Sequence, residues 1–245
     1  MSTSNNYISY CDSLHKSWYD GAFISDTDLN SQFQMEYSPE PYFQVEDGSN
    51  PLYMLLTNPG SGMDFQHRSN FKFSNYSKFS ETLSHVYLSK FFKNNAKRRL
   101  MNSIQIANEL GYAVLINIET IPFHSPSLNK IYALKLINSN RTLSRYTTLL
   151  SEFLIDKPIL IISACESRSS VSISTILKSN WLRFKLEIAG INAEDLTMRP
   201  LTFKGEKITS AIFNHKHKHL VLMMGTNNLP SIENFKNHMK LSFSK

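Results

Sequence analysis

Four short polar segments contain the residues whose types and spacing could do chemistry. They are rich in asparagine, serine, threonine and histidine, and they cover residues 57–63, 117–127, 163–170 and 225–231. Each belongs to the end of an apolar run. Amide, hydroxyl and imidazole groups offer both hydrogen-bond donors and acceptors. The pattern therefore indicates a polar ligand site built from several loops.

The first of these segments begins with Thr57-Asn58-Pro59-Gly60. On its own this sequence is typical of an ordinary turn, in which Pro59 fixes one backbone dihedral and Gly60 adopts a positive φ. A Gly-rich phosphate loop is disfavoured because no lysine follows at the required spacing.

A nucleophilic site is one alternative for the middle segments. His124 with Cys165 or Ser125 could serve a small-molecule hydrolase or transferase. The surroundings of Cys165 lack the Gly-x-Ser-x-Gly pattern of a nucleophile elbow, which disfavours an α/β-hydrolase. Because Cys11 is the only other cysteine and is far away in sequence, we expect two free thiols in a reducing compartment.

Two basic segments are candidates for contact with phosphates. Lys97, Arg98 and Arg99 end the densest basic stretch, residues 90–99, for which a solvated helix face is the alternative. The segment 215–219 reads His-Lys-His-Lys-His and would place three imidazoles on one side of a strand, where they could bind Zn²⁺. No carboxylate or cysteine lies nearby in sequence, so we expect no metal there. We expect instead that this basic segment begins a strand and faces DNA phosphates.

Composition also favours a polyanionic partner. The chain has 26 basic and 20 acidic residues and a net charge of +6, and its first 50 residues hold several acids but a single basic residue, Lys16. The remainder is therefore strongly basic, which suits a nucleic acid. No run of about 18 apolar residues predicts a membrane span. The first residues lack the basic and apolar regions of a secretory signal, so we expect a cytoplasmic protein.

The elements that must position these residues alternate along the chain. Four continuous apolar runs predict buried strands at 52–57, 113–118, 158–163 and 220–224. Apolar residues three and four apart predict helices around 8–23 and at 79–88, 96–110, 144–155, 171–189 and 231–241.

This alternation predicts an α/β fold, specifically a three-layer α/β/α sandwich around a four-stranded, mainly parallel sheet. Residues 1–50 are expected to form a helical and irregular extension packed on a core domain of residues 51–245. In such a sheet the ligand binds outside the carboxyl ends of the strands, where the four polar segments lie.

Several motifs together resemble the uracil-DNA glycosylase superfamily. The strand ending in Thr-Asn-Pro-Gly at 57–60 resembles its first active-site motif, especially that of the mismatch-specific branch. Val-Leu-Ile-Asn at 114–117 resembles the strand that delivers a base-reading asparagine. The turn Met-Gly-Thr-Asn-Asn-Leu-Pro-Ser at 224–231 lies where the second motif is found. The likeness covers roughly residues 50–240 in order and topology.

Two further motifs resemble less characterised glycosylase-like families. These are Pro-Glu-Pro-Tyr at 39–42 and Glu-Thr-Ile-Pro-Phe-His-Ser at 119–125. The chain departs from the uracil enzymes at two places: Asn58 stands where they carry an aspartate, and the second motif lacks their histidine. These departures argue against strict uracil specificity.

The resemblance implies a DNA glycosylase that cleaves the N-glycosidic bond of a flipped mismatched or modified base, without a cofactor. Asn58 is too weak a base to deprotonate water, but it can hold one water in line with the sugar carbon. Backbone N–H groups of the 58–61 turn and the helix N-terminus near Ser231 would stabilise the departing base, with His124 as a further donor. A role in defence against foreign DNA with modified bases is also compatible with it.

The base pocket follows from the same resemblance. Its expected members are Thr57, Gly60, Phe71, Asn117, Glu119 and Phe123, with Phe71 as the stacking platform and Phe65 and Phe73 as rivals. Asn117 and Glu119 are two residues apart on one strand face and could read a base edge, and a carboxylate would favour bases with an exocyclic amine. Core packing for the phenylalanines and a Glu119–Arg145 ion pair are the alternatives.

DNA is the expected partner, with no membrane and no obligatory protein partner. The expected DNA contacts are Asn227, Asn228, Ser231, Lys97, Arg98 and Arg99. Two rival functions stay open: a non-catalytic nucleic-acid binder on the same fold, and a small-molecule hydrolase that uses His124.

Overall fold

The computed structural model describes residues 3–44, 48–88, 95–165, 178–203, 206–213, 218–224, 232–233 and 235–236. Its helices are α1 (Thr3–Tyr19), α2 (Thr27–Asn30), α3 (Tyr76–Leu88), α4 (Asn95–Glu109), α5 (Lys130–Ser139), α6 (Arg141–Leu154) and α8 (Asn180–Ile188). Its strands are β1 (Tyr42–Gln44), β2 (Pro51–Leu56), β3 (Val114–Glu119), β4 (Ile159–Cys165), β5 (Leu196–Phe203), β6 (Glu206–Phe213) and β7 (Lys218–Met224). Short 3₁₀ turns are η1 (Asp64–Gln66), η2 (Arg68–Asn70) and η3 (Ala193–Asp195).

All of these strands belong to one mixed sheet in the order β1-β3-β2-β4-β7-β6-β5. The four strands expected from the apolar runs, β2, β3, β4 and β7, are adjacent and parallel to one another. Strands β1, β6 and β5 extend the sheet in antiparallel pairings. The α/β class is therefore confirmed.

The expected number of four strands was too small, since the described part of the sheet has seven strands. The buried central strands read as continuous apolar runs because both of their faces are covered. The antiparallel strands do not: β5 contains Arg199 and Pro200, β6 begins with Glu206 and Lys207, and β1 has only three residues. Their sequences lack the signal on which the four-strand expectation was based.

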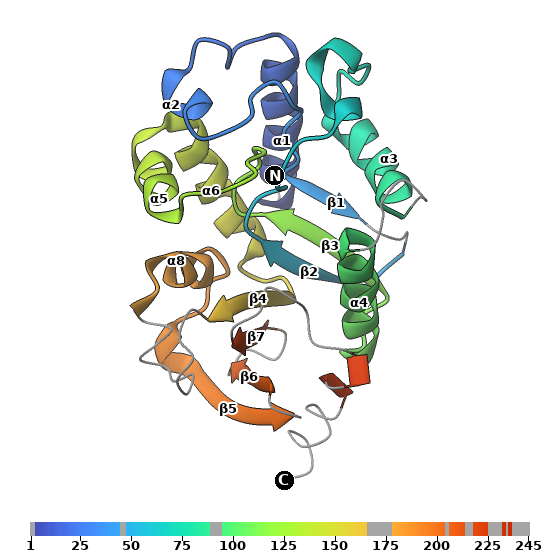
Figure 1. Cartoon of the computed structure of the whole chain (residues 1–245), viewed down its shortest axis with the longest axis vertical. Helices are drawn as coiled ribbons and strands as arrows, with labels where there is room; N and C mark the ends of the chain where they lie inside the picture. The colour runs from blue at the N-terminus through green and yellow to red at the C-terminus, as the bar shows by residue number, and fades with distance from the viewer. Residues whose placement is uncertain are drawn as a thin grey trace.

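The order of the connections reverses at β2, because the next two parallel strands lie on opposite sides of it. The chain leaves β2 through α3 and α4 to reach β3 on one side, and then passes through α5 and α6 to β4 on the other side of β2. Figure 1 shows α3 and α4 to one side of these strands and α5, α6 and α8 to the other. In open α/β sheets, the carboxyl ends of strands at such a switch point form the binding crevice. The turn that follows β2 lies at this point.

Asparagine and serine caps begin the helices that cover β2 and β4. Asn129, Asn140 and Ser179 accept backbone hydrogen bonds at the N-termini of α5, α6 and α8. Such caps satisfy N–H groups that have no partner within the helix. On α6 the buried residues recur every three or four positions, so one apolar face packs on the core.

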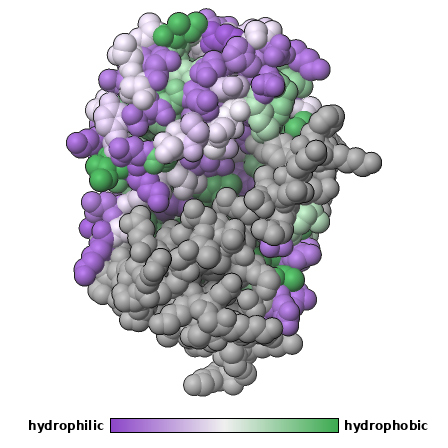
Figure 2. All heavy atoms as spheres, in the orientation of Figure 1, coloured by the Kyte–Doolittle hydropathy of each residue, from purple (hydrophilic) through white to green (hydrophobic). Residues whose placement is uncertain are grey.

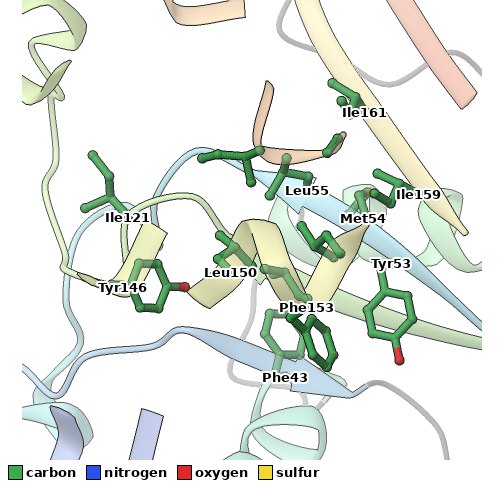
Figure 3. Packing of buried hydrophobic residues seen from close by; sticks show 14 of the residues in the cluster. Phe43, Tyr53, Met54, Leu55, Ile121, Tyr146, Leu150, Phe153, Ile159 and Ile161 are labelled. Atoms are coloured by element: carbon green, nitrogen blue, oxygen red, sulfur yellow. The ribbon is translucent and has the colours of Figure 1, made fainter. Parts of the chain in front are cut away.

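The N-terminal helix shares the core of the sheet. Tyr7 of α1 is fully buried, and its ring stacks on Phe153 of α6 with 4.8 Å between centroids. Its hydroxyl lies 3.1 Å from that of Tyr146. Figure 3 shows Phe153 between Tyr146 and Tyr53 of β2, and the Tyr53 ring meets Phe153 edge-on at 5.5 Å. Helix α1 therefore packs on the helix that covers the parallel strands.

Lys218, at the start of β7, was expected to face DNA phosphates, but its side chain does not reach solvent. It is buried, and its Nζ donates to the carbonyl oxygens of Ile155 (2.8 Å) and Ala189 (2.5 Å). These carbonyls lie at the C-caps of α6 and α8, where a cation is favourable. Burial lowers the pKa of Lys218, and the charge of Asp156 opposes this shift. Lys218 thus links the C-terminal ends of α6 and α8.

One face of the molecule is mainly hydrophilic where the structure describes it. Figure 2 shows polar residues dominating the part of this face that the structure describes, with hydrophobic residues scattered among them. No helix among the described residues is long and apolar enough to cross a membrane.

Candidate functional site

The turn after β2 and the loop after β3 are joined by direct hydrogen bonds. The Thr57 carbonyl accepts from the N–H of Ile121 (3.0 Å), and the Gly60 carbonyl accepts from the N–H of Ser125 (2.7 Å). The Asn58 side chain, half-buried, donates from Nδ2 to the Ser125 carbonyl at 3.1 Å. The two motifs that carry the resemblance therefore form a single structural unit.

Gly60 provides the bend of this turn. Its φ is +80°, a conformation that favours glycine. Further along, the N–H of Gly62 donates to Oε1 of Gln34 (3.1 Å), and the N–H of Met63 donates to Oε1 of Gln66 (3.0 Å). The second half of the turn is thus held by side chains from elsewhere in the chain.

The first half of the turn presents backbone donors. Within the described residues, the N–H groups of Asn58, Gly60 and Ser61 donate no hydrogen bond. Backbone N–H groups without a protein partner can donate to an anion or to a developing negative charge. The turn is therefore a candidate site for an anionic group outside the carboxyl end of β2.

A buried polar cluster lies beside the turn. Gln66 donates from Nε2 to the carboxylate Oε2 of Glu40 (2.8 Å), and the same Nε2 lies 3.2 Å from Nε2 of His124. The His124 Nε2 and the Glu40 Oε2 are 3.8 Å apart. All three side chains are at most 1% exposed. Two of the motifs, at 39–42 and 119–125, are thus brought together.

Burial decides the charge of His124. Desolvation lowers the pKa of His124 to about 4, although the backbone groups of Ser38, Gly60 and Ser61 favour the protonated form. The ring is therefore neutral near pH 7. A neutral, fully buried imidazole is a poor candidate for direct contact with a departing base.

The sequence did not reveal the partner of His124. Glu40 belongs to the Pro-Glu-Pro-Tyr motif, which gives it no role, and Gln66 belongs to no motif. Gln66 is fully buried in η1 although the neighbouring Asp64 and Phe65 are exposed. A three-residue 3₁₀ turn gives no periodic pattern, so no sequence signal could have identified it.

Asn117 and Glu119 both lie on β3 and both are 3% exposed. In register, Asn117 is beside Met54 and Glu119 is beside Leu56, the last residue of β2. Oδ1 of Asn117 has no hydrogen-bond partner among the described residues. The pair is therefore adjacent to the strand that leads into the Asn58 turn.

The alternative partner of Glu119, Arg145, is exposed, with its guanidinium 5.1 Å from the centroid of the Tyr10 ring. The Glu119 backbone carbonyl accepts from the Tyr146 hydroxyl at 2.7 Å.

The expected aromatic platform is a part of a larger aromatic cluster. Phe71 is half-buried, and its ring meets Trp18 at 4.8 Å and Phe79 at 5.1 Å, both edge-on. Its rival Phe73 is also half-buried, whereas Phe65 is 36% exposed.

Phe123 packs in the core. It is 1% exposed and lies between Phe23 and Phe33, with both centroids 5.7 Å away. The core-packing alternative describes its position in this structure.

Several expected site residues lie outside the described structure. These are Asn227, Asn228 and Ser231, together with His215 and His217. Lys97, Arg98 and Arg99 belong to α4, of which only the backbone is described at these positions. Among the described residues there is no group of three or more metal-ligating side chains, and Cys11 is a free, buried thiol.

The comparisons with known proteins leave the family open. No family model, no curated protein and no solved structure matches this chain.

Proposed function

We propose that the chain is a DNA glycosylase, which hydrolyses the N-glycosidic bond of a flipped mismatched or modified base and leaves an abasic site. The observation that carries the proposal is the turn after β2. It combines the half-buried Asn58 amide with three backbone N–H groups that donate to no described residue, at the switch point of the sheet. The proposal includes a three-layer α/β/α arrangement of the uracil-DNA glycosylase type.

The Asn58 amide would orient the attacking water. Nδ2 of Asn58 donates to the Ser125 carbonyl, so Oδ1 is the acceptor that remains for a water molecule. The water oxygen forms a bond to C1′ of the sugar, while the bond between C1′ and the base nitrogen breaks and its electron pair leaves with the base. The water loses a proton to solvent, and the base takes one up.

The turn would stabilise the leaving base. Cleavage of such a bond has an oxocarbenium-like transition state, so charge on the departing group matters more than the strength of the nucleophile. The N–H groups of Gly60 and Ser61 would donate to the base as negative charge develops on it. Donors aimed at developing charge are worth about 10²–10³ in rate each.

Asn117 and Glu119 would select the base. Both are buried beside the turn, and the resemblance places an asparagine of this strand on the base edge. A carboxylate accepts hydrogen bonds only, so Glu119 would favour a base with an exocyclic amine, such as cytosine or a modified cytosine. If the substrate preference of Glu119→Gln equals that of the unaltered protein, this assignment is wrong.

DNA contact would rest on the excess of basic residues. The net charge is +6 although the first 50 residues are acidic. Lys97, Arg98 and Arg99 are our candidates for phosphate contact. DNA binding should therefore weaken steeply as salt is raised, because bound counterions are released when phosphates are neutralised.

A base-release assay tests the proposal. The protein is incubated with DNAs that carry uracil, mismatches, hypoxanthine or modified cytosines, and alkali then converts abasic sites into strand breaks. We expect breaks with the unaltered protein, a loss on the order of 100-fold in Asn58→Ala, and no loss in Asn138→Ala. Asn138 is an exposed asparagine of α5 and serves as the matched control.

Each other outcome of this assay has a distinct meaning. DNA binding without any breaks would favour a non-catalytic binder on this fold. Breaks that persist in Asn58→Ala would show that another residue orients the water. Neither binding nor breaks would favour small-molecule chemistry.

A further inference from the structure

Three buried polar side chains beside the Asn58 turn are not explained by packing. Glu40, Gln66 and His124 are each at most 1% exposed. Burial of polar groups is unfavourable unless hydrogen bonds compensate for lost hydration. Methyl-bearing side chains of similar size would fill this space at lower cost. The cluster therefore indicates that these side chains hold neighbouring groups in a fixed position and do not serve stability alone.

The orientation of the Gln66 amide is fixed from two sides. Its Oε1 accepts from the N–H of Met63 at 3.0 Å, so its NH₂ group must point the other way. One hydrogen goes to Oε2 of Glu40 at 2.8 Å. The second hydrogen then faces Nε2 of His124, which lies 3.2 Å from the amide nitrogen.

This orientation determines the tautomer of His124. A nitrogen that receives a hydrogen bond carries no proton, so Nε2 is the acceptor and the proton of the neutral ring is on Nδ1. Nδ1 is buried and makes no hydrogen bond of normal geometry among the described residues. The backbone groups of Ser38, Gly60 and Ser61 interact with the ring as acceptors. The ring therefore lies beside the Gly60–Ser61 backbone without a hydrogen bond from Nδ1 to a described residue, and the N–H of the next residue, Ser125, donates to the Gly60 carbonyl at 2.7 Å.

We infer that Gln66 is a positioning residue, which holds His124 as the Nδ1–H tautomer and fixes its ring beside the Gly60–Ser61 backbone. Glu40 anchors the Gln66 amide. The inference rests on the proposed function for what the turn does, and it gives His124 a role through the turn instead of a direct contact with the base.

Further contacts of the turn involve the same segments of the chain. The N–H of Gln34 donates to the His124 carbonyl (2.9 Å), while Oε1 of Gln34 accepts from Gly62. The Tyr37 ring lies 6.0 Å from the His124 ring and directly against Gly62. Together with Gln66, these contacts hold residues 60–63 and leave the N–H groups of Gly60 and Ser61 to a ligand.

Nitrogen-15 NMR of histidine-labelled protein tests the tautomer directly. The His124 signals are identified by their absence in His124→Asn. We expect a protonated Nδ1 and an unprotonated, hydrogen-bonded Nε2 in the unaltered protein. A protonated Nε2 would overturn the inference. This measurement needs no substrate, so it stands apart from the proposed function.

Gln66→Met tests the role of the amide, because methionine has a similar length but no donor. We expect a mixture of His124 tautomers, faster hydrogen exchange at the N–H of Ser125, which donates to the Gly60 carbonyl, and base release slower on the order of 100-fold. An unchanged tautomer with unchanged exchange would contradict the inference. Glu40→Gln is the second variant should Gln66→Met fail to fold, and it should loosen the same amide.

A matched pair of substitutions at His124 distinguishes the roles of the two ring nitrogens. The amide nitrogen of Asn reaches the position of Nδ1, whereas that of Gln reaches the position of Nε2. We expect His124→Asn to retain more base release than His124→Gln and slower exchange at the Ser125 N–H. Equal or reversed effects would overturn the inference. If the unaltered protein releases no base at all, the proposed function fails, while the tautomer and the exchange rates still decide this inference.

Discussion

Burial of a single imidazole gives the protein a defined response to acid. Desolvation lowers the pKa of His124 from 6.5 to about 4 in the folded protein. The unfolded chain therefore takes up a proton near pH 6.5, whereas the folded protein resists protonation until about pH 4. Stability linked to His124 is complete above pH 6.5 and is lost as the pH falls toward 4, by roughly 3 kcal/mol in total.

Urea unfolding at several pH values between 7 and 4 measures this effect. We expect the free energy of unfolding to fall less steeply in His124→Asn than in the unaltered protein, because the variant has no imidazole to titrate at this position. Burial also lowers the pKa of His15, and that residue contributes with the same sign in both proteins. Parallel curves for the two proteins would show that His124 does not titrate between these limits.

The turn after β2 depends on two glycines for different reasons. An added Cβ at Gly62 would lie 2.1 Å from Cγ of Tyr37, whereas at Gly60 it would meet nothing within 4 Å. Gly60 is instead required by its positive φ. We expect Gly62→Ala to displace Tyr37, to cost about 1–3 kcal/mol and to impair base release. Gly60→Ala should cost about 1–2 kcal/mol through backbone strain alone.

Chemical unfolding and the base-release assay together distinguish these two variants. The Tyr37 ring contacts both Gly62 and His124, so its fluorescence or NMR signals should shift in Gly62→Ala and not in Gly60→Ala. Unperturbed Tyr37 signals in Gly62→Ala would mean that the turn moves instead of the ring.

Lys218 connects two helices through their last carbonyl groups. In Lys218→Met the carbonyls of Ile155 and Ala189 lose their shared donor, and the Ala189 carbonyl is left buried without it, which costs about 1–3 kcal/mol. The midpoint of urea unfolding measures the loss. Lys135→Met, at an exposed position of α5, is the control and should change stability by less than about 0.5 kcal/mol. Equal midpoints for the two variants would contradict the capping role.

Elements with a strong period could be predicted from the sequence, and irregular ones could not. The apolar runs that became β2, β3, β4 and β7 form the adjacent parallel strands of the sheet and needed no further context. The expected helix at 144–155 corresponds to α6 (Arg141–Leu154), whose buried positions recur every three or four residues. Strands β5 and β6 mix polar and apolar residues and were missed, as was α5, because tertiary packing defines them.

The same distinction applies to the candidate site. The placement of Asn58 beside the loop after β3 could be predicted from the sequence, because the carboxyl ends of parallel strands share one edge of the sheet. The contact between Glu40 and His124 through Gln66 joins three distant segments. Such a contact depends on the path of loops, for which a single sequence carries no periodic signal.

On the scale of the whole molecule, the N-terminal segment and the sheet depend on one another. Trp18 of α1 is fully buried, and its Nε1 donates to the Met35 carbonyl at 2.8 Å. Its ring meets Phe71 edge-on, and the Arg68 guanidinium lies 5.3 Å from its centroid. Phe71 and Arg68 belong to the loop that follows the Asn58 turn. The position of this loop therefore depends on a helix that precedes the core domain in sequence.

Trp18→Ala should destabilise the entire fold and not the N-terminal segment alone. Loss of a buried tryptophan costs about 3–5 kcal/mol, and because α1 shares the core with α6 we expect one cooperative transition at a lower midpoint. Circular dichroism and the fluorescence of the remaining tryptophan, Trp181 on α8, should report the same midpoint. An early transition seen by circular dichroism alone, with an unshifted Trp181 midpoint, would instead define residues 1–50 as an extension that unfolds independently of the core domain.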